Sequence, residues 1–224
     1  MNNLALFDLD HTLLPIDSDY EWGQFLVRLG VVDSESFQNS NANWFAQYQA
    51  GTMDPIAYLE FAFHTLAQFP RDQLNQWHQQ FMREVIEPNL HDAALNLVKA
   101  HQHKGDLVAI VTATNRFITA PIAHAFGVDH LIASTPETDA QGNITGALLG
   151  TPTYGSGKVT HTHQWLASLG KTLNDFPASF FYSDSHNDIP LLTLVTHPVA
   201  TNPSHTLANH AKMHSWPTLY LFND

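Results

Sequence analysis

The chain has 224 residues, of which 44% are hydrophobic, and a mean hydropathy of −0.17. This is enough to bury a sizeable core in a soluble globular protein, as one large domain or two smaller ones. Nine Lys and Arg stand against 21 Asp and Glu, and the net charge of −12 argues against nucleic acid as a partner. The absence of Cys excludes disulfides, thiolate nucleophiles and Cys-based zinc sites.

No apolar run approaches the roughly 20 residues that a membrane-spanning helix needs. The first residues, MNNLALFDLD, lack the cationic start and long apolar stretch of a signal peptide. We therefore expect a cytoplasmic protein without a membrane partner. The sequence leaves the oligomeric state open.

Residues 4–9 predict a buried parallel strand, because the run is short and continuously apolar up to two acids. Asp8 and Asp10 lie two positions apart, so both side chains face the same side of an extended chain. Taken alone, such a pair is also typical of a surface turn. It becomes a catalytic arrangement when other polar groups join it.

Residues 15–87 contain no strand-like run and repeat apolar residues at helical spacing. One set precedes Gly30 and a second set follows: Trp22, Phe25, Leu26 and Leu29, then Ile56, Leu59, Phe63 and Leu66. A glycine after such a run is typical of a helix C-terminus. The segment predicts a bundle of about four helices inserted directly after the first strand.

From Pro88 onward the pattern alternates between helices and strands. The expected order is a helix up to Gly105, strand 106–112, helix 116–126, strand 130–134, a hairpin within 136–150, helix 157–169, strand 178–183, a helix from about 188, strand 197–201, another helix and a last strand near 218–222. Alternating strands and helices imply an α/β fold, with a parallel sheet covered by helices on both faces.

Polar residues stand where expected strands end or helices begin in three further places. Thr112 and Thr114 follow a buried strand, Lys158 follows two glycines, and Asp184 and Asp188 follow another strand. In a parallel α/β sheet, ligands bind outside the carboxyl ends of the strands. We therefore expect the fold to gather these side chains beside the first pair of acids.

These runs, in this order, resemble the four motifs of the haloacid dehalogenase-like (HAD) phosphatases. DLDHT is similar to their DxDxT first motif, Thr112 to the second-motif Ser or Thr, Lys158 to the third-motif Lys, and Asp184 with Asp188 to the fourth-motif acids. The resemblance covers residues 4 to about 200. Haloacid dehalogenases themselves lack an acid at the position of Asp10, so the resemblance favours a phosphatase or a phosphotransferase.

The resemblance implies a Rossmann-like HAD core formed by residues 1–14 and 88–224. It implies that residues 15–87 form an all-helical cap domain at the C1 position, where a lid closes over a small substrate and excludes water. The expected partner is therefore a small-molecule phosphate ester.

The resemblance also assigns roles to the acids. Asp8 is the expected nucleophile, which gives an aspartyl-phosphate, and Asp10 the general acid and base. Mg²⁺ is the expected cofactor, held by the carboxylates of Asp8 and Asp184 and by the backbone carbonyl of Asp10, because it prefers oxygen ligands. The expected activity is that of a Mg²⁺-dependent phosphomonoesterase.

Other residues are expected to bind the phosphate. Thr112 and the amides of Ala113 and Thr114 would donate to its oxygens near a helix start, and Lys158 would add a fixed positive charge. Asp188 is expected to position Lys158 or a metal-bound water. Asn187 and Asn115 are further polar candidates.

Within the superfamily the chain looks most similar to subfamily IB, which contains phosphoserine phosphatases and HAD-type histidinol phosphatases. In phosphoserine phosphatases an acid nine residues past the nucleophile holds the substrate amine. Asp17 stands at that position and Asp19 lies nearby.

Two departures weaken the resemblance to phosphoserine phosphatases. Ala113 and Thr114 replace their usual glycines, and no cap arginine stands in a matching context for a substrate carboxylate: Arg28, Arg71 and Arg83. An amine without a carboxylate, as in histidinol phosphate, fits better. Four aromatic residues could line a pocket for its ring, although their helical spacing is more typical of core packing: Trp22, Trp44, Phe45 and Tyr48.

Two alternatives to hydrolysis stay open at this stage. One is a phosphotransferase or mutase of the same superfamily, and the other is a non-catalytic protein that binds a phosphate ligand. The chain also has 15 His, but pairs such as His101 and His103 are spaced so that a helix turns their rings apart. We expect structural or surface roles for them.

Overall fold

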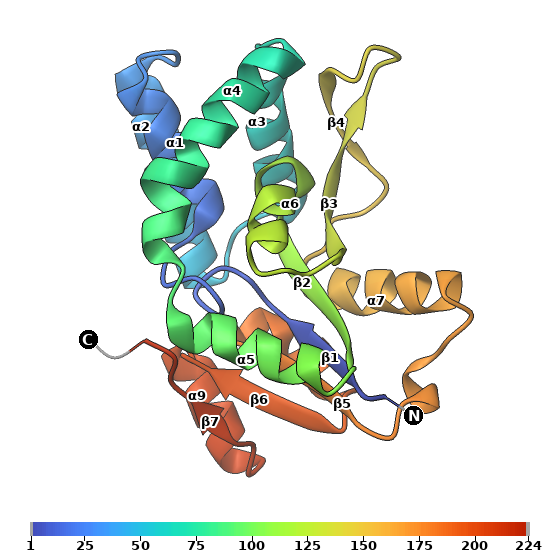
Figure 1. Cartoon of the computed structure of the whole chain (residues 1–224). Coiled ribbons are helices and arrows are strands. Elements are labelled where there is room, and N and C mark those ends of the chain that lie inside the picture. The colour runs from blue at the N-terminus through green and yellow to red at the C-terminus, as the bar shows by residue number, and fades with distance from the viewer. Residues whose placement is uncertain (1, 223–224) are drawn as a thin grey trace.

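The computed structural model describes residues 2–222, without the side chains of Ser34, Ser36, Gln38, Tyr48 and Gln49. Within these residues one sheet has seven strands in the order β4-β3-β2-β1-β5-β6-β7 (Figure 1). The strands are β1 (Leu4–Phe7), β2 (Leu107–Asn115), β3 (His130–Thr138), β4 (Ile144–Leu149), β5 (Ser179–Ser183), β6 (His197–Thr201) and β7 (Thr218–Leu219). Neighbours pair in parallel, except β3 and β4, which are antiparallel.

The central strand β1 is buried on both faces, which explains its uninterrupted apolar sequence. Its side chains alternate, so Ala5 and Phe7 join one core while Leu4 and Leu6 join the other. The first core includes residues of α5 (Asp92–His103) and α6 (Arg116–Ala125), and the second includes residues of α7 (Ser156–Ser168), α8 (Ile189–Leu192) and α9 (His205–Met213). The predicted α/β fold, with helices on both faces of a mostly parallel sheet, is confirmed.

Within the described residues, four α-helices lie between β1 and α5, as predicted, and they stand above one end of the sheet (Figure 1). They are α1 (Ser18–Arg28), α2 (Ser34–Ala50), α3 (Pro55–Ala67) and α4 (Arg71–Phe81), and a π-helical turn (Met82–Ile86) follows. Asp17 caps α1 and Asp54 caps α3, each through side-chain bonds from backbone amides. Gly30, with φ +68°, allows the chain to leave α1 in a left-handed conformation.

Aromatic packing joins these helices to the sheet side of the molecule. The Trp22 ring lies 5.2 Å from that of Phe81 and 5.7 Å from that of Phe117, which belongs to α6. His78 packs against Trp22 and hydrogen-bonds the Ile118 carbonyl through Nε2 at 2.9 Å. The four-helix segment therefore shares one apolar core with α6 and the sheet.

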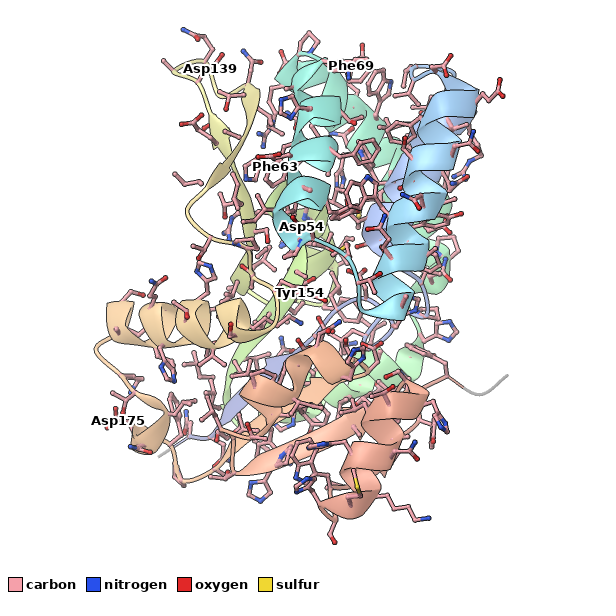
Figure 2. All side chains as sticks on the ribbon, turned by 180° about the vertical axis from the view of Figure 1, so that it is seen from behind. Asp54, Phe63, Phe69, Asp139, Tyr154 and Asp175 are labelled. Carbon is pink, nitrogen blue, oxygen red and sulfur yellow. The ribbon has the colours of Figure 1, made fainter. Side chains whose placement is uncertain are left out.

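The predicted hairpin is present as β3 and β4, and it extends beside α3 (Figure 1). Its turn carries Gly142 at φ +83°, a conformation that favours glycine. Asp139 lies at the far tip of this hairpin, near the upper ends of the helices in Figure 2. There the Arg71 amide donates to Asn143 Oδ1 at 3.1 Å, which ties the start of α4 to the hairpin.

Strand ends differ from the predicted ones in several places, and β3 runs on to Thr138 where the prediction ended at residue 134. β1 stops at Phe7, because the chain turns back as the amides of Thr12, Leu13 and Leu14 all donate to the Leu9 carbonyl. β2 continues to Asn115, where it still pairs with β3 beyond a bulge. The last strand is short, Thr218–Leu219. No helix in residues 2–222 has the length and apolarity needed to cross a membrane.

Candidate active site

The candidate site lies at the carboxyl ends of three adjacent strands, β2, β1 and β5. Phe7, the last residue of β1, is level with Ile110 of β2 and Tyr182 of β5. Asp8, Thr112 and Asp184 follow within two residues of these positions. The topology therefore brings together side chains that are far apart in sequence, at the edge where parallel sheets bind ligands.

Lys158 connects the first and fourth motifs. Its Nζ lies 2.9 Å from Asp8 Oδ1 and 2.7 Å from Asp188 Oδ2, and the side chain is buried. Burial disfavours the ammonium, but the carboxylates of Asp188 and Asp8 outweigh this effect and raise the pKa of Lys158 above its ordinary value. Ser183 Oγ also donates to Asp188 Oδ2 at 2.6 Å, so this acid holds the lysine from a fixed position.

Gly157 allows α7 to begin where it brings Lys158 to the site. A Cβ atom at this glycine would lie 2.1 Å from the carbonyl oxygen of Pro152, closer than any real contact. Because glycine has no side chain, the start of α7 can approach the preceding loop this closely.

Asp10 is buried, and both of its carboxylate oxygens have partners. Oδ1 accepts from the Ser18 amide and Oδ2 from Thr114 Oγ1, each at 2.7 Å. Burial, followed by the charge of Asp17, raises the pKa of Asp10 to about 6. A carboxyl whose pKa is raised toward neutral pH is suited to both general acid and general base chemistry. The sequence pointed to the Thr114 hydroxyl at a strand end, but its hydrogen bond to Asp10 was not predicted.

Asp184 is also buried and is held by Thr12. Thr12 Oγ1 donates to Asp184 Oδ1 at 3.1 Å and accepts from the Asp184 amide at 3.0 Å. Burial, then the charges of Asp8 and Asp188, raises the pKa of Asp184 well above its ordinary value. Thr12 is a further residue that sequence reasoning passed over, although it is the threonine of the DxDxT motif.

The donor set fits a divalent cation. Asp8, Asp184 and Asp188 are three buried carboxylates beside one lysine, so the cluster carries excess negative charge. Burial, followed by the charges of Asp8 and Asp188, disfavours the charged form of Asp184, and a cation beside these acids would offset both effects. Within residues 2–222 no group of three or more His, Cys, Asp or Glu side chains is arranged around a metal position. The expected set differs from such a group, because it uses two carboxylates and one backbone carbonyl.

The expected phosphate-binding residues lie on the same cavity as Asp8, Asp10 and Asp188, whereas Asp184 is not among its lining residues. Thr112 is buried and its Oγ1 accepts from the Thr114 amide at 3.1 Å. Ala113 and Asn187 also line the cavity. Asn187 lies in a helical turn that begins at Ser185, whose Oγ accepts from the Asn187 amide.

The cavity extends from the strand ends to the four-helix segment and has a volume of about 60 Å³. This is room for roughly five water molecules. Tyr154 and Pro55 are both among its lining residues. Figure 2 shows Tyr154 between α7 and the lower end of α3, where Asp54 marks the helix start.

The two acids proposed for substrate specificity both line this cavity but differ in their surroundings. Asp17 Oδ1 accepts from the amides of Asp19 and Tyr20, at 3.0 and 2.9 Å, and so caps α1. Asp19 Oδ1 accepts from Asn115 Nδ2 at 3.2 Å. Burial, followed by the charge of Asp17, raises the pKa of Asp19 to about 7, although the Tyr58 hydroxyl lowers it in part.

Asn115, the further polar candidate, is thus a structural link between β2 and α1. Its Oδ1 accepts from the Ile118 amide and caps α6, while its Nδ2 reaches Asp19. These contacts do not indicate a direct role for Asn115 in binding phosphate.

The aromatic candidates separate into two groups. Trp44 and Phe45 line the cavity, whereas Trp22 packs in the apolar core. The side chain of Tyr48 lies outside the described residues. Tyr20 and Tyr58 line the cavity as well, and neither was singled out in the sequence.

None of the cap arginines is among the cavity-lining residues that the structure describes: Arg28, Arg71 and Arg83. Arg71 instead contacts the hairpin through the Gly142 carbonyl and lies over the Phe117 ring.

A mostly parallel sheet whose carboxyl edge carries buried acids and a lysine places the chain among the α/β proteins that bind a ligand at that edge. The model of the family described as haloacid dehalogenase-like hydrolase matches residues 5–193. The chain belongs to the haloacid dehalogenase-like hydrolase family.

Two similar proteins align with almost the whole chain. A protein of Neisseria meningitidis serogroup C (strain 8013) named histidinol-phosphatase is 42% identical, over 98% of this chain and 99% of its own. A crystal structure of a protein of unknown function from Bordetella pertussis Tohama I is 48% identical, with a TM-score of 0.95, over 99% of this chain and 100% of that one.

A substrate-bound phosphoserine phosphatase has a TM-score of 0.70 over 98% of this chain and 93% of its own. It is 16% identical, so the likeness is one of fold.

Proposed function

We propose that this phosphatase hydrolyses a small phosphate monoester through an aspartyl-phosphate at Asp8. In the first step a carboxylate oxygen of Asp8 attacks phosphorus, the ester P–O bond breaks, and Asp10 gives its proton to the leaving oxygen. In the second step water attacks the phosphoryl group while Asp10 takes a proton, which releases phosphate and restores the Asp8 carboxylate. The raised pKa of Asp10 supports the acid role.

The other site residues hold the phosphate in line with Asp8. Lys158, already 2.9 Å from Asp8, places a positive charge beside the attacked group. Thr112 and the amide of Ala113 donate to phosphate oxygens in this proposal, which their presence among the cavity-lining residues supports. Asp188 acts through Lys158, whose ammonium it fixes at 2.7 Å.

We further propose Mg²⁺ as the cofactor, held by the carboxylates of Asp8 and Asp184 and the backbone carbonyl of Asp10. When bound, it neutralises the clustered carboxylates and polarises the phosphate.

In the same proposal, residues 15–87 are a cap domain over a core of residues 1–14 and 88–224. The cavity supports this division, because residues of both segments line it. A cap over the site excludes water from the first step.

The substrate we propose is histidinol phosphate, an amine-bearing ester without a carboxylate. One observation carries this choice: the cavity is lined by Asp17 and Asp19, and no arginine is among its described lining residues. A substrate carboxylate, as in phosphoserine, would meet only like charge at that end. The 42% identity to a protein named histidinol-phosphatase supports the same substrate.

Phosphate release from histidinol phosphate and from phosphoserine tests this proposal. With Mg²⁺ present we expect kcat/KM for histidinol phosphate to exceed that for phosphoserine at least about tenfold, because only phosphoserine places a carboxylate against the acids. Asp8→Asn should abolish release from both esters. A preference for phosphoserine, full activity of Asp8→Asn, or transfer of phosphate to an added alcohol in place of water would contradict the proposal.

A further inference from the structure

Three carboxylates line the cap side of the cavity, and two of them have their hydrogen bonds satisfied. Asp10 accepts at both oxygens, and Asp17 accepts two backbone amides as the N-cap of α1. The helix N-terminus also stabilises the charge of Asp17. Both acids are therefore committed to the protein's own structure.

Asp19 is different. Its side chain is 6% exposed, and its Oδ1 accepts a bond from Asn115. Its Oδ2 is fully buried and makes no hydrogen bond of good geometry with the residues that the structure describes, although the Tyr58 hydroxyl lies near enough to Asp19 to lower its pKa in part. Asp19 borders the main cavity and also a smaller one of about 20 Å³ within the four-helix segment. A buried carboxylate oxygen without a partner is costly, so it calls for a ligand or a water.

The charge around Asp19 favours a cationic ligand over a water. Among the described residues that line the main cavity, the cation is Lys158, and it is bound to Asp8 and Asp188. Asp10 and Asp17 add negative charge close to Asp19. A water satisfies the hydrogen bond but leaves this charge uncompensated. An ammonium group donates the hydrogen bond through one of its three N–H groups and also compensates the charge.

We propose that Asp19, and not Asp17, is the specificity-determining residue that receives the protonated amine of the substrate. The inference rests on the proposed function, because it assumes an amine-bearing phosphate ester. It explains why the cavity wall keeps an acid that neither caps a helix nor belongs to one of the four motifs. Asp19 then binds the end of the substrate away from the phosphate.

Two esters that differ in one group test the inference: histidinol phosphate and imidazolylpropyl phosphate, which is the same ester without the amine. In the wild-type protein we expect kcat/KM to be about 100-fold higher for histidinol phosphate, as for a buried charge pair. In Asp19→Asn this ratio should fall to within about threefold of unity, since the amide keeps the shape and loses the charge. Asp54→Asn is the matched control, because Asp54 is an exposed acid that caps a helix of the same segment and is not itself among the cavity-lining residues, and it should keep the wild-type ratio.

Each other outcome overturns the inference. A ratio near unity in the wild-type protein shows that the amine is not recognised, and an unchanged ratio in Asp19→Asn means that Asp19 is only a hydrated structural acid. If the ratio of the two kcat/KM values falls to near unity in Asp17→Asn and not in Asp19→Asn, the amine binds Asp17. If Asp19→Asn does not fold by circular dichroism, Asp19→Ser replaces it. Failure of the wild-type protein to release phosphate from either ester removes the proposed function as well, whereas equal release from both removes this inference alone.

Discussion

At Lys158, three charges depend on one another. The ammonium is buried between Asp8 and Asp188, and burial raises the pKa of Asp188 to about 6 even though the lysine opposes that rise. A buried ion pair contributes little net stability, but the loss of one partner leaves uncompensated charge. The lysine is therefore required by its neighbours as well as by the proposed chemistry.

The variant Lys158→Met tests this dependence. We expect the free energy of unfolding to fall by about 3 kcal/mol, because two buried carboxylates lose their cation. We also expect kcat to fall by at least about 100-fold, because a charge aimed at the phosphate is lost. Urea denaturation in the presence of a chelator and steady-state kinetics measure the two effects. Lys99→Met, on the exposed face of α5, is the control and should leave both unchanged; equal effects in the two variants would refute this reading of Lys158.

At the scale of single elements, the site depends on how strands end and helices begin. β1 stops at Phe7 because the next residues turn back on the Leu9 carbonyl, and this turn presents Asp8 and Asp10. The start of α7 is equally constrained, because Gly157 approaches the carbonyl of Pro152. Small backbone shifts in these segments move charged groups directly.

Gly157→Ala tests whether the approach of α7 positions Lys158. The added Cβ would clash with the Pro152 carbonyl, so α7 has to shift, and we expect a loss of about 1–3 kcal/mol in unfolding free energy. Since Lys158 is the next residue, kcat should fall about tenfold or more. Ser156→Ala changes an exposed position of the same turn and serves as the control. Wild-type stability and kcat in Gly157→Ala would show that the close approach has no role.

At the scale of the whole molecule, one apolar core joins the four-helix segment to the sheet side. His78 lies in this junction, against Trp22 and the Ile118 carbonyl. Burial lowers the pKa of His78 below its ordinary value. The junction therefore favours neutral histidine and becomes less stable when the ring must take up a proton.

The pH dependence of stability follows from this shift. Below about pH 6.5 the unfolded chain binds a proton at His78 that the folded chain does not, so stability falls with falling pH until the folded pKa is reached. The raised pKa values of Asp10, Asp19 and Asp188 act in the opposite direction, because these groups gain protons more readily when folded. The contribution of His78 to the pH dependence of stability is therefore measured by comparing the wild-type protein with a variant that lacks this histidine.

When the pH is lowered from about 7.5 to about 5.5, we expect the free energy of unfolding to decrease less in His78→Gln than in the wild-type protein. Glutamine keeps a donor for the Ile118 carbonyl and does not titrate. Urea denaturation of both proteins at the two pH values gives the difference. His124→Gln, at an exposed position of α6, is the control and should follow the wild-type trend. Parallel curves for wild type and His78→Gln would show that burial does not hold His78 neutral.

The sequence by itself determined the strand and helix order and the residues at the strand ends. Apolar runs and helical spacing are local signals, and parallel strands place their carboxyl ends at one edge whatever lies between them. For this reason Asp8, Thr112, Lys158 and Asp184 could be assigned to one region from patterns and a family resemblance.

Only the tertiary structure decided what each side chain contacts. Thr114 binds Asp10 across 104 residues of sequence, and Thr12 binds Asp184 across 172. Trp22 lies in the core and not on the cavity, and Asp17 caps a helix while Asp19 keeps an oxygen without a partner. Such contacts depend on the packing of elements that have no local relation, since burial and distance are properties of the folded chain.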